Sequence, residues 1–558
     1  MIYGGECMKT DCKSLKNVML FSIIIAIQLF VTIYFEFQKA SLFGDELFSY
    51  AFANAFYTNT TNNPTNSYTA NAFVYFHHWL DCSVWKHMFT VQGGQQFDYA
   101  SVIYNQEFDI SPPLHTLVLH TICSFFPDIF SKWFSYSINA AFFIFAQIVL
   151  FKIGNCLFTD SRISLLLCTI YGFSWGGINT VVYLRMYMMV VFFALLLIYA
   201  AIKVYDNATY NTHPTGLFVL AFVAAFGGIL THMHFLIFSF FVGLIFVGLF
   251  WTKGLWKSGL IFGLSLLCSV IAAFLSYPRI MEVLFGKGNA GFYIDPKYYD
   301  VFSVFKTYFR IINYELFGYL GNAFLLLLFL SIVIRLIVNY RKESNVIGII
   351  DSFDKSINDS IVSNTKNNRI IFTGICLVVL ATFGFICFFT VYMANRYMYI
   401  FYPFLTILMV GFIAMFHKRF IIIFYASMVL LIYNFSFYNT GYLHAYERGQ
   451  SVIAGVFVNE NVDAVVIQKA ESFWPLIWRG EMLMEAENSF LITVERLDES
   501  VEEIKDKELS KQNLIVYIAE NVKTDHDVLI SKFTKDIDFK YFEKLCDIAG
   551  STYVLTKE

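Results

Sequence analysis

Long apolar runs are the feature that most limits what this chain can fold into. The first, NVMLFSIIIAIQLFVTIYFEF, begins at residue 17, and runs long enough to cross about 30 Å of hydrocarbon recur up to residue 437. Hydrophobic residues make up 57% of the chain and charged residues only 15%, whereas soluble domains carry about 25% charged residues. The sequence therefore predicts a mainly helical, polytopic membrane protein.

Eleven apolar runs qualify as membrane spans. A twelfth candidate, LHTLVLHTICSFF at 114–126, has only 13 residues, which suits a re-entrant or juxtamembrane helix better than a crossing one. The eleven predicted spans lie near residues 17–36, 133–153, 162–180, 181–202, 215–232, 233–251, 258–277, 321–339, 370–393, 397–416 and 419–437.

Basic residues between the runs indicate which side each loop faces. With eleven spans, five basic connections fall on the side of the N-terminal lysines, as the positive-inside rule predicts, whereas the basic residues at 278–320 go against this trend. The five carry Lys152 and Arg162; Lys203; Lys253 and Lys257; the stretch from Arg335 to Arg369; and HKR at 417–419. The N-terminus is then cytoplasmic, in a plasma (inner) membrane. The first outer loop (37–113), the second outer loop (278–320) and the C-terminal tail are expected on the extracytoplasmic side.

The tail differs from the body of the chain. From residue 435 onward it contains 22 acids against 13 bases. Short β-like runs such as VDAVVIQKA and NLIVYIA alternate with charged, helix-like segments such as DESVEEIKDKEL, a pattern typical of a small α/β domain. We therefore divide the chain into a membrane domain (1–437) and an extracytoplasmic α/β domain (438–558).

Ionisable residues gather at the outer ends of the predicted spans. The adjacent acids Asp45 and Glu46 follow the first span, and DISPPLHTL places Asp109 before the short helix. Ser111 is expected to cap that helix, which would open with two prolines. Charges near hydrocarbon are costly unless paired or hydrated, so their gathering at one face predicts a polar cavity.

Two arginines at span ends suit an anionic ligand. In VVYLRMYMMVV, Arg185 is expected about one turn inside a helix, and ANRYMYIFYP carries Arg396 near the last spans. A guanidinium binds phosphate through two parallel hydrogen bonds, and Lys287 and Lys297 add positive charge in the second outer loop. The alternative is that both arginines snorkel to the interface beside ordinary interfacial tyrosines.

The segment LTHMHFL places His232 and His234 at a span boundary. Such a pair is more often an interfacial hydrogen-bonding pair than a metal site; if a divalent metal is bound, His234 and Asp109 are the first choice of ligands. The ten cysteines form no CxxC pair, so the sequence predicts neither a disulfide framework nor a zinc site. A divalent metal is the one cofactor left open, and no nucleic-acid partner is expected.

Five sequence features of the chain, taken in order, resemble those of the bacterial GT-C glycosyltransferases. The resemblance consists of an acid pair after the first span, D-x-x-P-P-L before a short helix, R-x-Y at a span start, a His-containing span end and R-Y near the last spans. It covers roughly residues 15–437, and the closest groups are the aminoarabinose transferase and protein O-mannosyltransferase relatives. Leu184 and Ser111 depart from the pattern, since relatives often have an acid and an aromatic or histidine there.

The resemblance implies a transferase that takes a sugar from a polyprenyl phosphate on the outer side, with Asp45 as the base and Glu46 positioning the acceptor or a metal. A phosphate leaving group needs positive charge more than a strong acid, and an acceptor hydroxyl needs a base, so direct displacement with inversion is expected. The expected acceptor is an envelope glycan, a glycolipid or a protein, within membrane lipid. The predicted site residues are Asp45, Glu46 and Asp109 for catalysis; Arg185, Arg396, Lys287 and Lys297 for the donor phosphate; and Tyr187, His115 and Tyr397 for substrate binding.

Three other functions fit the composition. In a transporter or flippase for a lipid-linked saccharide, the same charges would line a pathway. The spans show no inverted halves with broken helices at matching places, which disfavours this class. A polysaccharide polymerase or ligase would also favour outer arginines, and a sensor would use the tail to bind its ligand.

Overall fold

The structure, a computed structural model, divides into two compact units. The helical unit comprises Met1–Tyr34, Asn139–Val182 and Met186–Asn439, and the mixed unit comprises Phe35–Ile138, Tyr183–Arg185 and Thr440–Glu558. The structure describes residues 4–39, 41–55, 76–107, 109–158, 160–210, 215–285, 300–320, 366–390, 393–416, 420–436, 462–469, 479–508, 513–547 and 550–557.

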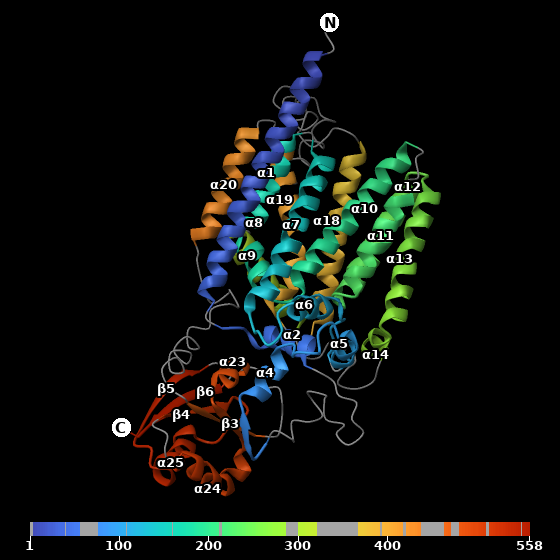
Figure 1. The fold of residues 1–558 in the computed structure, drawn as a ribbon. Coiled ribbons are helices and arrows are strands. Elements are labelled where there is room, and N and C mark those ends of the chain that lie inside the picture. The colour runs from blue at the N-terminus through green and yellow to red at the C-terminus, as the bar shows by residue number, and fades with distance from the viewer. Residues whose placement is uncertain are drawn as a thin grey trace. The chain divides into compact units, whose positions relative to one another are not determined.

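The helical unit contains the long helices drawn in Figure 1, together with a few shorter ones. Continuous apolar sequence gives them their length, because a backbone in lipid must satisfy its own hydrogen bonds and a helix does so within one segment. The described elements, two of which extend into the mixed unit, are α1 (Gly4–Gln38), α7 (Lys132–Leu157), α8 (Ser161–Phe173), α9 (Trp175–Val182), α10 (Tyr187–Thr209), α11 (Thr215–Ile229), α12 (His234–Thr252), α13 (Trp256–Ser276), α14 (Arg279–Phe285), α15 (Val301–Phe317), α18 (Lys366–Phe389), η1 (Asn395–Phe401), α19 (Tyr402–Phe416) and α20 (Phe420–Ser436).

Seven helices in the described part of the chain are long and apolar enough to cross a membrane, and the bent pair α8 and α9 makes an eighth candidate. The chain is therefore a mainly helical, multi-pass membrane protein, as the sequence predicts. Two further predicted spans form the shorter helices α11 and α20, and the predicted span at 321–339 lies outside the described residues. The number eleven itself stays a prediction.

The mixed unit combines helices with one six-stranded sheet. Its elements are α2 (Gly44–Asn54), β1 (Trp79–Asp81), α4 (Ser83–Phe89), α5 (Tyr99–Gln106), α6 (Leu114–Ser124), β2 (Asp463–Gln468), α23 (Gly480–Glu485), β3 (Asn488–Thr493), η2 (Val494–Arg496), α24 (Leu497–Glu508), β4 (Asn513–Ala519), α25 (His526–Asp536), β5 (Tyr541–Asp547) and β6 (Gly550–Thr556). The strand order is β1-β3-β2-β4-β6-β5.

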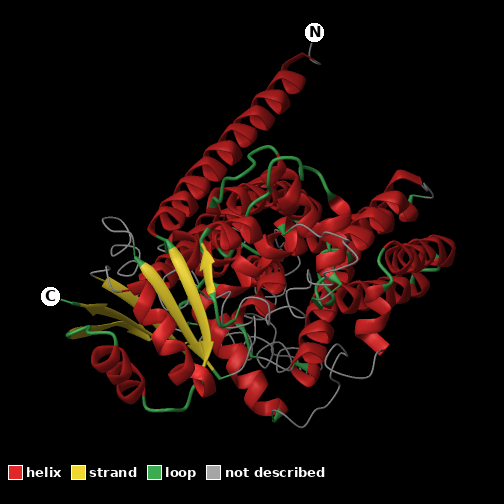
Figure 2. Ribbon diagram, turned by 60° about the horizontal axis from the view of Figure 1, so that its bottom comes forward, coloured by secondary structure: helices red, strands yellow, loops and turns green. Residues whose placement is uncertain are grey.

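The sheet, yellow in Figure 2, is parallel at β3-β2-β4 and antiparallel at its other pairings. Alternate residues of the central strands, among them Val465, Ile467 and Val516, are fully buried in a core shared with α24 and α25. Apolar positions along those two helices, such as Ile504 and Phe533, complete this core. The small α/β fold predicted for the tail is thus present.

The sheet also includes a strand from the first outer loop. Strand β1 pairs antiparallel with β3, aligning Trp79 with Phe490. Nearby, the buried Trp85 donates its indole N–H to the Ser489 hydroxyl over 2.8 Å. The sequence predicts the first outer loop and the tail in different domains, whereas the mixed unit contains both.

Candidate active site

Helix α2 begins with the acid pair. Asp45 and Glu46 both lie in its first turn, where the positive end of the helix dipole favours negative charge. The backbone N–H of Phe43, just before the helix, donates to Glu46 Oε2 over 2.7 Å. The two acids follow the first span closely because this short helix starts only six residues after α1 ends.

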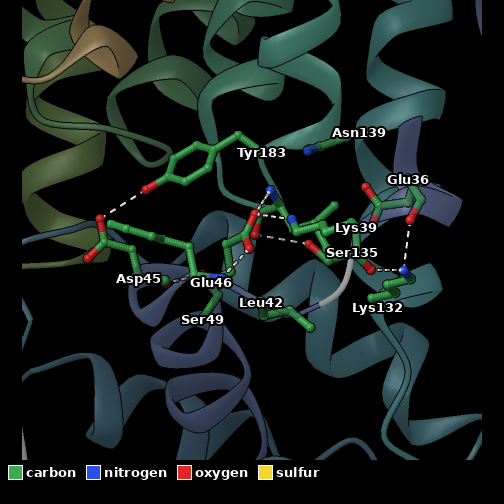
Figure 3. A network of polar contacts seen from close by, with 12 residues as sticks. Glu36, Lys39, Leu42, Asp45, Glu46, Ser49, Lys132, Ser135, Asn139 and Tyr183 are labelled. Atoms are coloured by element: carbon green, nitrogen blue, oxygen red, sulfur yellow. Dashed lines mark hydrogen bonds and ion pairs between the residues drawn. The ribbon is translucent and has the colours of Figure 1, made fainter. Parts of the chain in front are cut away.

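Glu46 points into the protein (Figure 3). Its Oε1 accepts from Lys39 Nζ over 2.5 Å and from the backbone N–H of Leu184 over 2.7 Å, and the Lys39 and Glu46 side chains are both 0% exposed. Because both oxygens are held by protein donors, Glu46 does not face a substrate. This differs from the predicted role of Glu46 in positioning the acceptor or a metal.

Asp45 is the acid of the pair that remains partly exposed. The hydroxyl of Tyr183 donates to its Oδ2 over 2.9 Å (Figure 3). Arg185 Nη1 donates to the backbone oxygen of Asp45 over 2.8 Å and to the hydroxyl of Ser49 over 3.0 Å. Tyr183 thus binds the carboxylate of Asp45, and the guanidinium of Arg185 binds the backbone of the same residue.

Arg185 lies in a break between two helices. Helix α9 ends at Val182 and α10 begins at Tyr187, so the prediction that Arg185 lies one turn inside a helix was wrong. The break is stabilised because the Leu184 N–H bonds to Glu46 and the Leu184 oxygen accepts from the Ser135 hydroxyl over 3.2 Å. Side chains replace the helical partners that this segment lacks.

Helix α6 lies beside α2 and contributes His115, which is buried. Burial, reinforced by the positive charge of Arg185, lowers the pKa of His115 to about 3. His115 is therefore a neutral imidazole near the arginine. This placement suits hydrogen bonding to a substrate better than binding a phosphate by charge.

Asp109 lies before α6, where Gln106 Nε2 and the Ile110 N–H donate to its carboxylate over 3.3 Å and 2.8 Å. The cap prediction was wrong, because α6 begins at Leu114 after Pro113, with no side-chain cap. The Ser111 backbone oxygen instead accepts from Gln106 Nε2 over 2.7 Å.

The remaining described site residues belong to the helical unit, where they form a ring cluster. Ring centroids lie 5.4 Å apart for Tyr187 and His232, 4.8 Å for His232 and His234, and 4.9 Å for His234 and Tyr397. The guanidinium of Arg396 lies over the Tyr397 ring at 5.7 Å. This cluster of aromatic rings, imidazoles and one cation suits a sugar or a phosphate.

The structure tests neither the predicted phosphate-binding lysines nor the predicted metal ligands. Lys287 and Lys297 lie outside the described residues. Among the residues that the structure does describe, no group of three or more His, Cys, Asp or Glu side chains could hold a metal ion. The metal pair Asp109 and His234 therefore stays a prediction.

Glu315, which is not among the predicted site residues, is fully buried in the helical unit. Asn179 and Asn395 each donate to its Oε1 over 3.0 Å, and the hydroxyl of Tyr402 donates to Oε2. This carboxylate fixes the residue just before Arg396. A lone acid within the aromatic segment IINYELFGY was the available signal.

No protein-family model matches the sequence, and a search of curated proteins gives no match. The structure is similar to two crystal structures of ArnT from Cupriavidus metallidurans. The one bound to undecaprenyl phosphate aligns with a TM-score of 0.45 and 10% identity, over 96% of this chain and 98% of that chain. The apo structure aligns with a TM-score of 0.43 and 9% identity, over 80% of this chain and 88% of that chain.

Proposed function

We propose that this membrane protein is a glycosyltransferase that moves a sugar from a polyprenyl-phosphate carrier to an acceptor hydroxyl. The observation that supports it most is the arrangement at the start of α2, where partly exposed Asp45 is bonded to Tyr183 beside Arg185. A base and a cation are the two groups that displacement of a phosphate by a hydroxyl requires.

Asp45 is the proposed general base. The hydrogen bond from Tyr183 fixes one carboxylate oxygen, and Ser49 and Arg185 restrict the backbone that carries the side chain. A base must lie within hydrogen-bond reach of the hydroxyl that it deprotonates, so a fixed orientation favours transfer. The acceptor oxygen would attack the anomeric carbon from the face opposite the phosphate and invert its configuration.

Positive charge would stabilise the departing phosphate. Arg185 is the candidate in the mixed unit, and we propose that Arg396, Lys287 and Lys297 bind the same phosphate. Two guanidiniums provide planar donor pairs that match phosphate oxygens better than ammonium groups do. The substrates would contact His115, Tyr187 and Tyr397, and a divalent metal at Asp109 and His234 remains the alternative way to add charge.

The predicted orientation suits a lipid-borne donor. If the basic connections lie on the side of the N-terminal lysines, as the positive-inside rule predicts, α2 and the tail would lie on the extracytoplasmic face. Nucleotide sugars are not supplied there, so the sugar would arrive on a polyprenyl phosphate. The acceptor would be an envelope glycan, a glycolipid or a protein.

Replacing Asp45 by asparagine tests the proposal. Purified protein in bilayer discs is incubated with labelled polyprenyl-phosphate sugars and extracted envelope, and transfer of label is measured. We expect Asp45→Asn to lower kcat by about 100-fold to 10,000-fold, the contribution of a general base, and to leave undecaprenyl phosphate binding intact. Glu107→Gln, an exposed acid at the end of α5, is the matched control and should keep full activity.

Two results would overturn the assignment. Full activity of Asp45→Asn would remove Asp45 as the base. Movement of an intact lipid-linked saccharide across vesicle membranes, without transfer of label to any acceptor, would instead indicate a transporter.

A further inference from the structure

A residue of the tail contacts the segment that leads into the acid pair. The backbone N–H of Leu42, three residues before Asp45, donates to Glu481 Oε2 over 2.8 Å. Leu42 is only 2% exposed, so water does not readily replace this acceptor. An unmet buried N–H costs about 1–3 kcal/mol, and Glu481 therefore restricts the path of the chain into α2.

The same tail helix also packs against an element that holds the far end of α2. Gly480 packs so closely on α4 that a Cβ there would lie 2.6 Å from the ring of Phe89. The Phe89 backbone oxygen in turn accepts from Asn54 Nδ2, in the last residue of α2, over 2.8 Å. Helix α23 is thus linked to α2 at both ends.

We infer that Glu481 is a positioning residue for Asp45, so that the tail contributes to the active site. The inference depends on the function proposed above. Glu481 does not touch the reacting atoms; it holds the Leu42 backbone, and through it the first turn of α2, where a base must be held in place.

Burial favours the neutral form of Glu481. Burial, with the negative charges of Glu46 and Glu485, raises the pKa of Glu481 to about 8, against the opposing effects of the Leu42 N–H and of Lys39. Lys132 also interacts electrostatically with Glu481. A protonated carboxyl can still accept the Leu42 N–H, so glutamine is the matched replacement and alanine the disruptive one.

Kinetics on the full-length protein test the inference. In Glu481→Ala we expect kcat for transfer to fall by up to about 100-fold, the effect of misplacing a catalytic group. The KM values for donor and acceptor should stay unchanged, and Glu481→Gln should retain most of the activity. Glu495→Ala, an exposed acid in η2 of the same tail, is the control and should behave as the wild type.

Amide hydrogen exchange gives a readout that does not depend on activity. In Glu481→Ala, peptides covering residues 41–49 should exchange faster, while β4 at the centre of the sheet keeps its protection and shows that the tail is folded. An unchanged kcat, or a raised acceptor KM at normal kcat, would overturn the inference. If the wild type transfers no sugar, the proposed function fails, whereas unchanged exchange would refute the Glu481 contact alone.

Discussion

Adjacent residues on a helix face different surroundings, and Asp45 and Glu46 differ in this way. Successive α-helical positions differ by about 100° around the axis, so Asp45 and Glu46 point in different directions from the first turn of α2. Glu46 forms a fully buried ion pair with Lys39, and Asp45 stays partly exposed beside Tyr183. Removing one partner of such a buried pair costs about 3–5 kcal/mol, which makes Glu46 a residue of the scaffold.

Removing the Tyr183 hydroxyl should impair catalysis without unfolding the protein. A hydrogen bond to a charged group contributes about 1.5–3 kcal/mol, so we expect Tyr183→Phe to lower kcat by about 10-fold to 100-fold. Tyr205→Phe is the control, because its buried hydroxyl has no hydrogen-bond partner among the described residues. Transfer assays on both variants check this, and equal activity would mean that Tyr183 does not orient Asp45.

The sequence could single out Asp45 and Arg185 because charges at the ends of apolar runs are conspicuous. It could not show that Glu46 turns inward. That orientation depends on Lys39 and on the backbone of Leu184, which is 138 residues away. From the sequence, Tyr183 could equally be an ordinary interfacial tyrosine. Its hydrogen-bond partner Asp45 is 138 residues away in the chain, so their contact becomes visible only in the folded protein.

At the scale of elements, the bend between α8 and α9 depends on one glycine. The two helices meet at 61°, and a Cβ on Gly177 would lie 2.0 Å from the backbone oxygen of Tyr171. The hydroxyl of Ser174 accepts the Gly177 N–H over 3.1 Å and donates to that same oxygen over 2.7 Å. The bend leaves no room for a side chain at this position.

Gly177→Ala should therefore destabilise the protein. Overpacking costs about 1–3 kcal/mol, and here the clash is with backbone, which cannot rotate away. Gly248→Ala in α12 is the matched control, because nothing lies within 4 Å of a Cβ there, and it should be neutral or slightly stabilising. Thermal unfolding in detergent measures both, and an unchanged midpoint for Gly177→Ala would show that the bend can relax.

The predicted spans that lie within the described residues correspond to helices, but the sequence did not reveal where those helices break. Hydropathy along GGINTVVYLRMYMMVV is nearly continuous, so the sequence placed Arg185 within a helix. The break forms because Glu46 and Ser135 satisfy the backbone of Leu184 from outside the segment. Contacts that arise only after folding cannot be read from apolar periodicity.

At the scale of the whole molecule, the strands and helices of the tail were predictable, but the strand β1 that the first outer loop adds to its sheet was not. The short β-like runs of the tail correspond to β2, β3, β4 and β6, and its charged segments correspond to α24 and α25. Strand β1 has only three residues, too few for alternation to reveal it. Its place in the sheet becomes visible only when it aligns with β3.

Stability should respond to pH through two groups of the mixed unit. The pKa of His115 is lowered from 6.5 to about 3. Its contribution to the free energy of unfolding is therefore present above pH 6.5 and is lost as the pH falls toward 3. The pKa of Glu481 is raised from 4.5 to about 8. Its contribution to the free energy of unfolding is therefore present below pH 4.5 and is lost as the pH rises through 8.

Unfolding midpoints measured across this range should separate the two groups. Relative to the wild type, His115→Gln should change the slope of stability only on the acid side, and Glu481→Gln only between pH 4.5 and 8. Parallel curves for either variant and the wild type would show that the replaced group does not titrate on unfolding.

The pairing of β1 with β3 also dictates an order of events during biosynthesis. Trp79 emerges early, whereas its neighbour Phe490 is made after nearly all the apolar helices. At about 5–20 residues per second, the ribosome needs roughly 20–80 s to cover that interval. Strand β1 therefore stays without its neighbour for that time, and the contact between Leu42 and Glu481 can form only after the tail has been synthesised.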